Sequence, residues 1–194
     1  MTDRIFFLCA FLAAAVMVAI AVLPGFNTRP TGPVSGGNTD YRRIEVSGAQ
    51  LNRFVAGGDA DISLVRADGE AALRIEVAAA TLADDPIRGP HFILDRDLET
   101  VFAGREVRIT IRARAADQYG AEQMRVNYSV GSAIESGWEK FTITREFADS
   151  VFTWTPPERT PGTDAGYDYL GIRPVVPEKQ RAILVQSVVF EPAL

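Results

Sequence analysis

Residues Val107–Ala115 read VRITIRARA, and apolar and polar side chains alternate at every position. A period of two places the apolar side chains on one face of an extended strand and the polar side chains on the other. An amphipathic helix would instead repeat its apolar residues every three to four positions. The stretch therefore predicts a β-strand with one buried face.

The same alternation recurs along the chain between turn signals such as Asp68-Gly69. Further alternating runs lie at 73–77, 124–130, 141–144 and 152–154. Ile183–Phe190 is almost continuously apolar, which predicts a strand that is buried on both faces or carries a bulge. Many short strands with such punctuation predict a mainly β fold, a β-sandwich or jelly roll, with one short helix near 97–102.

Composition excludes several classes of site. The 194 residues contain 20 Lys and Arg against 25 Asp and Glu, a net charge of −5, with one Cys and one His. A disulfide framework and a cysteine-rich zinc site are therefore excluded, and His91 is expected to be structural. The negative balance argues against a nucleic acid partner that is bound through its phosphates. We expect no metal and no cofactor.

The N-terminal segment has the length and apolar composition of a membrane-spanning helix. Ile5–Leu23 is a run of 19 residues without a charged side chain, and as a helix it would span roughly 28 Å, close to the thickness of the bilayer core. We predict a transmembrane helix or signal-anchor that contacts the lipid bilayer. Ala19-Ile20-Ala21 also offers a small-x-small cleavage site, so a cleaved signal stays an alternative.

The predicted organisation has four parts. They are a short tail at 1–4, the transmembrane helix at 5–23, a flexible Pro/Gly linker at 24–40 and a β-sandwich domain at 41–194. Long domains translocate largely regardless of their charge. We therefore expect a single-pass inner (cytoplasmic) membrane protein of the cell envelope, with its C-terminal domain outside the cytoplasm, in the periplasm.

The order of the segments resembles that of carbohydrate-binding modules with the galactose-binding-like jelly-roll fold. The segments that carry the resemblance are Gly69–Ile75, Gly104–Arg114, Gly137–Phe141, Phe152–Pro156, Tyr169–Pro174 and Ile183–Phe190. The resemblance implies a jelly-roll β-sandwich of mainly β class behind the one N-terminal transmembrane helix, and a sheet that binds polysaccharide. Such modules often have a calcium-binding Asp in the last strand, where this chain has Gln186-Ser187, so we expect no calcium.

An arginine stripe is the most unusual feature of the predicted strands. Arg108, Arg112 and Arg114 share one face of one strand, and Arg125 and Asn127 share one face of the next. If those strands pair, their side chains lie about 5 Å apart and could clamp the carboxylates of an acidic polysaccharide. The alternative is a solvated face on which each arginine is paired with an acidic residue.

Two tyrosines at loop edges complete the predicted ligand-binding set by adding stacking or hydrogen bonds. The set consists of Arg108, Arg112, Arg114, Arg125, Asn127, Tyr119 and Tyr167. The larger aromatic residues fall on the apolar side of the alternation and are predicted to lie in the core. They are Trp138, Phe141, Phe152, Trp154 and Tyr169.

We predict a membrane-anchored, non-catalytic binding module for an envelope or extracellular carbohydrate. The alternative is a structural or protein-interaction subunit of a membrane or cell-envelope complex with a membrane-protein partner. An enzyme is the weakest hypothesis, because glycoside hydrolysis needs two carboxylates across a cleft. The acidic residues near 84–85, 95–99 and 164–168 instead fall in predicted loops.

Overall fold

The computed structural model describes residues 7, 10–14, 16–18, 29–37, 39–58, 60–78, 88–132, 134–159 and 166–193. The chain divides into two compact units, Met1–Pro30 and Thr31–Leu194. In the first unit, residues 7, 10–14 and 16–18 are helical, and the rest of the predicted span at 5–23, with its cleavage site, lies outside the described residues. Among the described residues, no helix has the length and apolar character needed to cross a membrane.

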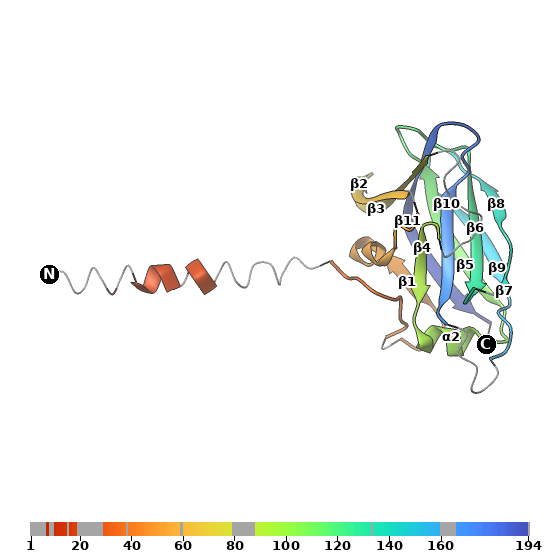
Figure 1. Cartoon of the computed structure of the whole chain (residues 1–194), viewed down its shortest axis with the longest axis horizontal. Coiled ribbons are helices and arrows are strands. Elements are labelled where there is room, and N and C mark those ends of the chain that lie inside the picture. The colour runs from red at the N-terminus through yellow and green to blue at the C-terminus, as the bar shows by residue number, and fades with distance from the viewer. Residues whose placement is uncertain are drawn as a thin grey trace. The chain divides into compact units, whose positions relative to one another are not determined.

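In the second unit, the described residues form two antiparallel sheets that enclose one core (Figure 1). The six-stranded sheet has the order β2-β3-β11-β5-β9, and β1 also pairs with β11. Its strands are β1 (Ile44–Ser47), β2 (Ala60–Ala67), β3 (Glu70–Ala78), β5 (Val107–Ala115), β9 (Ala148–Trp154) and β11 (Gln180–Pro192).

The five-stranded sheet has the order β4-β10-β6-β7, and β8 also pairs with β6. Its strands are β4 (His91–Leu94), β6 (Gln123–Val130), β7 (Ile134–Glu135), β8 (Glu139–Thr142) and β10 (Asp168–Pro174). Two short helices are present among the described residues of this unit. η1 (Gly48–Arg53) lies between β1 and β2 of the six-stranded sheet, and α2 (Arg96–Phe102) connects β4 of one sheet to β5 of the other. The short helix predicted near 97–102 is thus confirmed, and the side chain of Asp95 caps its N-terminus by accepting a hydrogen bond from the Arg96 backbone N–H at 2.8 Å.

Alternation decides which side of each strand enters the core. In β5, Val107, Ile109 and Ile111 are buried and Arg108 is exposed. In β6, the buried apolar residues are Met124, Val126, Tyr128 and Val130. Because both strands turn their apolar sides to the same core from opposite sheets, their polar sides face away from each other.

This arrangement corrects the predicted arginine surface. Strand β5 pairs with β11 and β9, whereas β6 pairs with β10, β8 and β7. Arg112 and Arg125 therefore lie on opposite outer faces of the sandwich and cannot form one site.

Strand β11 carries a bulge at Gln186, one of the two alternatives predicted for Ile183–Phe190. Its register against β5 shifts between Val185 and Ser187, so one extra residue is accommodated there. On the edge of β11 opposite β5, the partner strand also changes at the bulge. Residues 180–185 of β11 pair with β3, and residues 187–190 pair with β1. The bulge thus marks a change of neighbouring strand as well as a change of register.

The compact unit begins earlier than the predicted boundary at 41. Val34 is buried in the core, and its backbone bonds with β4 through the Ile93 carbonyl and the Asp95 N–H. Arg53 donates to the Pro33 carbonyl at 2.7 Å, and Asp97 accepts from the Ser35 hydroxyl at 2.8 Å. Residues 31–37, 39 and 40 of the predicted linker therefore belong to the domain.

Three of the five aromatic residues lie where they are predicted. Phe152 is buried, and Phe141 and Trp154 pack against the core. For Trp138 and Tyr169 the prediction is wrong, because both lie on the outer face of the five-stranded sheet. Trp138 stacks on arginines of that face, and Tyr169 alternates with the inward Leu170.

Candidate functional site

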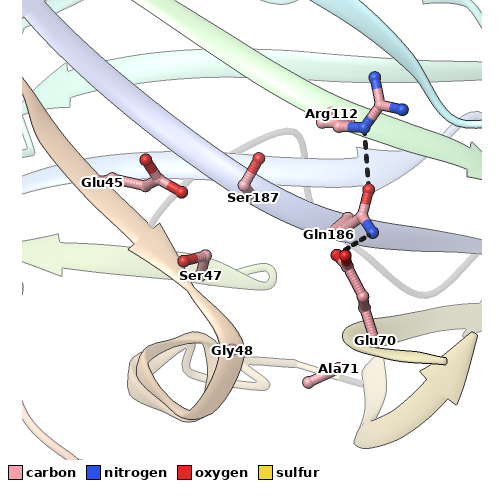
Figure 2. Close-up of a pocket in the computed structure, with 8 residues that line it drawn as sticks. All are labelled: Glu45, Ser47, Gly48, Glu70, Ala71, Arg112, Gln186 and Ser187. Atoms are coloured by element: carbon pink, nitrogen blue, oxygen red, sulfur yellow. Dashed lines mark hydrogen bonds between the residues drawn. The ribbon is translucent and has the colours of Figure 1, made fainter.

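The bulge of β11 opens a hollow on the outer face of the six-stranded sheet (Figure 2). It encloses about 480 Å³. Six of its eight lining residues are polar, and they come from β1, β3, β5 and β11. The lining residues are Glu45, Ser47, Gly48, Glu70, Ala71, Arg112, Gln186 and Ser187.

A chain of hydrogen bonds fixes the middle of this hollow. Arg112 Nε donates to Gln186 Oε1 at 2.8 Å, and Gln186 Nε2 donates to Glu70 Oε2 at 2.6 Å (Figure 2). Arg112 Nη1 also donates to Asp149 Oδ1 at 3.1 Å. Both ends of the Gln186 amide are engaged, so its orientation is set, while 44% of the Arg112 side chain stays exposed. The floor is polar, ordered and accessible.

Two further hollows extend this one along the sheet. The next, of about 560 Å³, shares Glu70, Arg112 and Gln186 with the first. The third, of about 510 Å³, shares Asp117 and Arg145 with the second. These three adjoining hollows are together called the groove below.

Arg114 lies in the wall of the groove with its charge matched locally. Its Nη1 and Nη2 donate to the two carboxylate oxygens of Asp117 at 2.8 and 3.2 Å. Its guanidinium also lies over the Phe147 ring, 5.2 Å from the centroid. The Arg114 hydrogen bonds lower the pKa of the Asp117 carboxyl below its ordinary value. Both Arg112 and Arg114 therefore have acidic partners, as the alternative to the acidic-polysaccharide clamp predicted.

The outer face of the five-stranded sheet is built differently. Arg125 of β6 and Arg173 of β10 are cross-strand neighbours, and Trp138 lies over both, 4.8 and 4.1 Å from ring centroid to guanidinium. Arg173 is only 1% exposed. Asn127 is fully buried, donates to Glu135 Oε2 at 3.0 Å and accepts from the Ser136 hydroxyl at 3.2 Å. Arg173 and Asn127 thus form a closed polar layer on this face.

The seven predicted ligand-binding residues are therefore dispersed. Arg112 and Arg114 line the groove, and Arg108 is exposed on the same face but outside the groove lining. Tyr119 is exposed in the connection between β5 and β6 with a φ of 58°, and Tyr167 is exposed just before β10. Arg125 and Asn127 belong to the other sheet.

Sequence reasoning missed Gln186 and Glu70 as parts of a site. The signal for Gln186 is present, because Gln186-Ser187 places two polar residues in succession inside an apolar strand. Two polar neighbours break the period of two and mark a bulge. Glu70 follows the Asp68-Gly69 turn and has no distinguishing signal of its own.

A second charged cluster is buried between the sheets. Asp168 is 1% exposed, accepts from the Tyr128 hydroxyl at 2.7 Å and pairs with Arg159, while its backbone N–H donates to Glu99 Oε1 at 2.9 Å. Arg159 also pairs with Glu99 at 3.4 Å. Burial raises the pKa of both carboxyls above their ordinary values. The prediction that the acids at 95–99 and 164–168 are solvated loop residues is therefore wrong for Glu99 and Asp168.

His91 is structural in the described part of the chain. It is buried, its Nδ1 lies 2.7 Å from the Gly89 carbonyl, and its ring meets Tyr169 edge-on at 5.2 Å. Among the described residues, no group of three or more His, Cys, Asp or Glu side chains could hold a metal ion.

Comparison with known proteins informs on the fold alone. No protein-family model matches the chain, and no curated protein sequence matches it significantly. The CBM22-1 xylan-binding domain of Paenibacillus barcinonensis Xyn10C superposes with a TM-score of 0.52 at 12% identity, covering 77% of this chain and 92% of that domain. A family 11 carbohydrate-binding module of Clostridium thermocellum gives 0.44 at 10% identity, covering 81% and 93%. The domain therefore has a jelly-roll β-sandwich fold like that of the CBM22-1 domain.

Proposed function

We propose that this protein is a non-catalytic carbohydrate-binding module whose polysaccharide lies in the groove of the six-stranded sheet. The observation that carries the proposal is the fixed polar floor formed by Arg112, Gln186 and Glu70. Sugar hydroxyl groups both donate and accept hydrogen bonds, and a floor with oriented donors and acceptors can match them without reorganising.

The shape of the groove supports a polymer in preference to a small molecule. Its three hollows adjoin through shared lining residues. Two lie on the outer face of the six-stranded sheet, and the third is lined by the end of β5 and by the connections at 116–122 and 143–145. An extended chain can occupy all three hollows, whereas a monosaccharide fills one of them. The similarity of the fold to a xylan-binding domain is consistent with this proposal.

A non-catalytic role fits the placement of the acidic side chains. Hydrolysis of a glycosidic bond uses two carboxylates on either side of the bond, one of them with a raised pKa. Glu99 and Asp168 have raised pKa values, but they are buried with Arg159 and line none of the three hollows. We therefore assign binding, and no bond cleavage, to the groove.

Membrane anchoring is part of the proposal and stays a prediction. Residues 5–23 would hold the chain in the inner membrane, and the domain would meet its polysaccharide outside the cytoplasm. Extraction of the chain from cell membranes by alkaline carbonate would contradict an anchor, and retention in the pellet would support it.

Affinity electrophoresis of the purified full-length chain in gels containing soluble polysaccharides tests the binding function. We expect retardation by at least one polymer and a loss of about tenfold in affinity for Arg112→Ala, because hydrogen bonds to a charged group are the strongest in the floor. Arg108→Ala is the matched control, since Arg108 lies on the same strand and face but outside the groove lining. Equal loss in both variants, or no retardation by any polymer, would favour the protein-interaction alternative.

A further inference from the structure

The charges in the groove do not balance. The two hollows nearest the bulge are lined by five carboxylates and three guanidiniums. Arg112 pairs with Asp149 and Arg114 with Asp117, while Glu45 pairs with Arg43. Among the described residues, the remaining groups make no ion pair. These groups are Asp68, Glu70, Glu146 and Arg145. Three carboxylates therefore face one guanidinium, and the uncompensated charge is negative.

We propose that the groove is selective for a glycan that carries free amino groups, such as a β-1,4-linked glucosamine polymer. This inference rests on the proposed function, because it names the chemical class of the polysaccharide in the same groove. A protonated amine offers three hydrogen-bond donors and one positive charge, and the carboxylates of Glu70 and Asp68 accept from such donors. The shape of the groove accommodates the polysaccharide chain, and the negative charge of its lining favours glycans with protonated amino groups.

The two paired arginines of the groove, Arg112 and Arg114, are poorly placed to bind the opposite class of ligand. A uronic acid needs a guanidinium with two parallel N–H groups directed at its carboxylate. In Arg114 both terminal nitrogens already donate to Asp117. In Arg112, Nε donates to Gln186 and Nη1 to Asp149. At Arg112 and Arg114 a uronate would have to displace these partners. At Arg145, which forms no ion pair among the described residues, it would meet the carboxylates of Asp68, Glu70 and Glu146 that line the same hollow.

The expected selectivity is moderate because the carboxylates are exposed. Exposed ion pairs contribute little individually and weaken as salt screens them. A cationic oligomer that contacts two or three of these carboxylates should bind about fivefold to tenfold more tightly than its neutral counterpart at low salt. The difference should shrink in about 500 mM salt, where the screening length is only a few ångströms.

Calorimetric titration of the full-length chain with four β-1,4-linked hexasaccharides tests the inference. Their sugars are glucosamine, N-acetylglucosamine, glucose and glucuronic acid, so backbone length is constant while charge changes. The titration is made at about pH 5.5, where the glucosamine amines are protonated. We expect the glucosamine hexamer to bind most tightly and the glucuronic acid hexamer most weakly.

A double variant and a control variant test whether Asp68 and Glu70 cause the preference for glucosamine. Asp68→Asn with Glu70→Gln keeps the shape of the side chains and removes two carboxylates that form no ion pair among the described residues, so the preference for glucosamine over glucose should fall below about twofold. Glu178→Gln is the matched control, because Glu178 is exposed and lies outside the groove lining, and it should leave the preference unchanged. Thermal melts confirm that each variant is folded.

Each result has a distinct meaning. Equal affinity for all four hexamers, or tightest binding of the glucuronic acid hexamer, would overturn the amine selectivity and leave the groove as a carbohydrate site. Retention of the preference in the double variant would also overturn it. Failure of every hexamer to bind the folded chain would overturn the proposed function itself.

Discussion

The two outer faces of the sandwich carry similar side chains, which are buried on one face and accessible on the other. On the five-stranded sheet, Arg125 and Arg173 lie under Trp138, and Asn127 is fully buried. On the six-stranded sheet, Arg112 and Gln186 line an open groove. An amide beside an arginine is thus part of a closed layer on one face and part of an accessible floor on the other.

This contrast separates stability from binding. Alternation along a strand determines which face a side chain occupies, but it does not determine what covers that face. Substitutions on the closed layer should therefore lower the free energy of unfolding without changing ligand affinity. Substitutions in the groove should lower ligand affinity with little cost in stability.

The largest expected effect is on the closed face. Trp138→Ala removes the ring that lies over Arg125 and over the buried Arg173, and we expect the free energy of unfolding to fall by about 2–3 kcal/mol. Urea denaturation followed by circular dichroism measures this change. Tyr167→Ala, at an exposed aromatic residue, should change it by less than about 0.5 kcal/mol. A shift in polysaccharide affinity of Trp138→Ala would break the separation of the two faces.

A smaller loss of stability is expected for the buried amide. Asn127→Ala removes the hydrogen bonds with Glu135 and Ser136, so unfolding should become about 1–2 kcal/mol easier while affinity for the polysaccharide is retained. Urea denaturation and affinity electrophoresis of the same preparation measure both quantities. Unchanged stability would show that Asn127 is not part of a closed layer.

The buried acids Glu99 and Asp168 should give folding a pH dependence. Burial raises the folded-state pKa of Glu99 above its ordinary value of 4.5, so its contribution to stability is complete below about pH 4.5 and is lost as the pH rises through the folded-state pKa. Glu99→Gln cannot lose a proton, so its stability relative to the parent should rise between about pH 4.5 and 7. Thermal melts across this range test the sign, with exposed Glu106→Gln as the control. A fall in relative stability with rising pH would contradict it.

The smallest expected effect is in the groove. Gln186→Ala removes the amide between Arg112 and Glu70, and we expect affinity for the polysaccharide to fall about fivefold, or about 1 kcal/mol. The free energy of unfolding should change by less than about 1 kcal/mol, because the residue is half-buried at a bulge. Affinity electrophoresis of Gln186→Ala and Asn127→Ala in the same gels compares the loss of one amide side chain on each face.

The sequence predicts β5 because its signal is local, and it leaves a bulge in β11 as one of two alternatives. Val107–Ala115 alternates throughout, and its predicted ends are those of the strand. The strands β1 and β4 were not predicted, because four residues are too few to establish a period. Longer β2 alternates Ile62 and Leu64 with polar residues, and this signal was overlooked.

The site was harder to predict because it depends on pairing between distant strands. Nothing local distinguishes Arg112 from Arg125, and only the assignment of their strands to different sheets separates them. Gln186 meets Glu70 across 116 positions of sequence. The partner of Arg114, by contrast, is only three residues away at Asp117, and this spacing could have indicated that its charge is neutralised.

Hydrogen–deuterium exchange of the full-length chain, with and without a saturating polysaccharide that it binds, tests the location of the site most directly. We predict slower exchange in the segments that form the groove, at residues 45–48, 70–71 and 185–187. Residues 123–130 and 168–174 of the five-stranded sheet should exchange at unchanged rates. Protection of the latter segments with no protection of the former would contradict the assignment of binding to the groove.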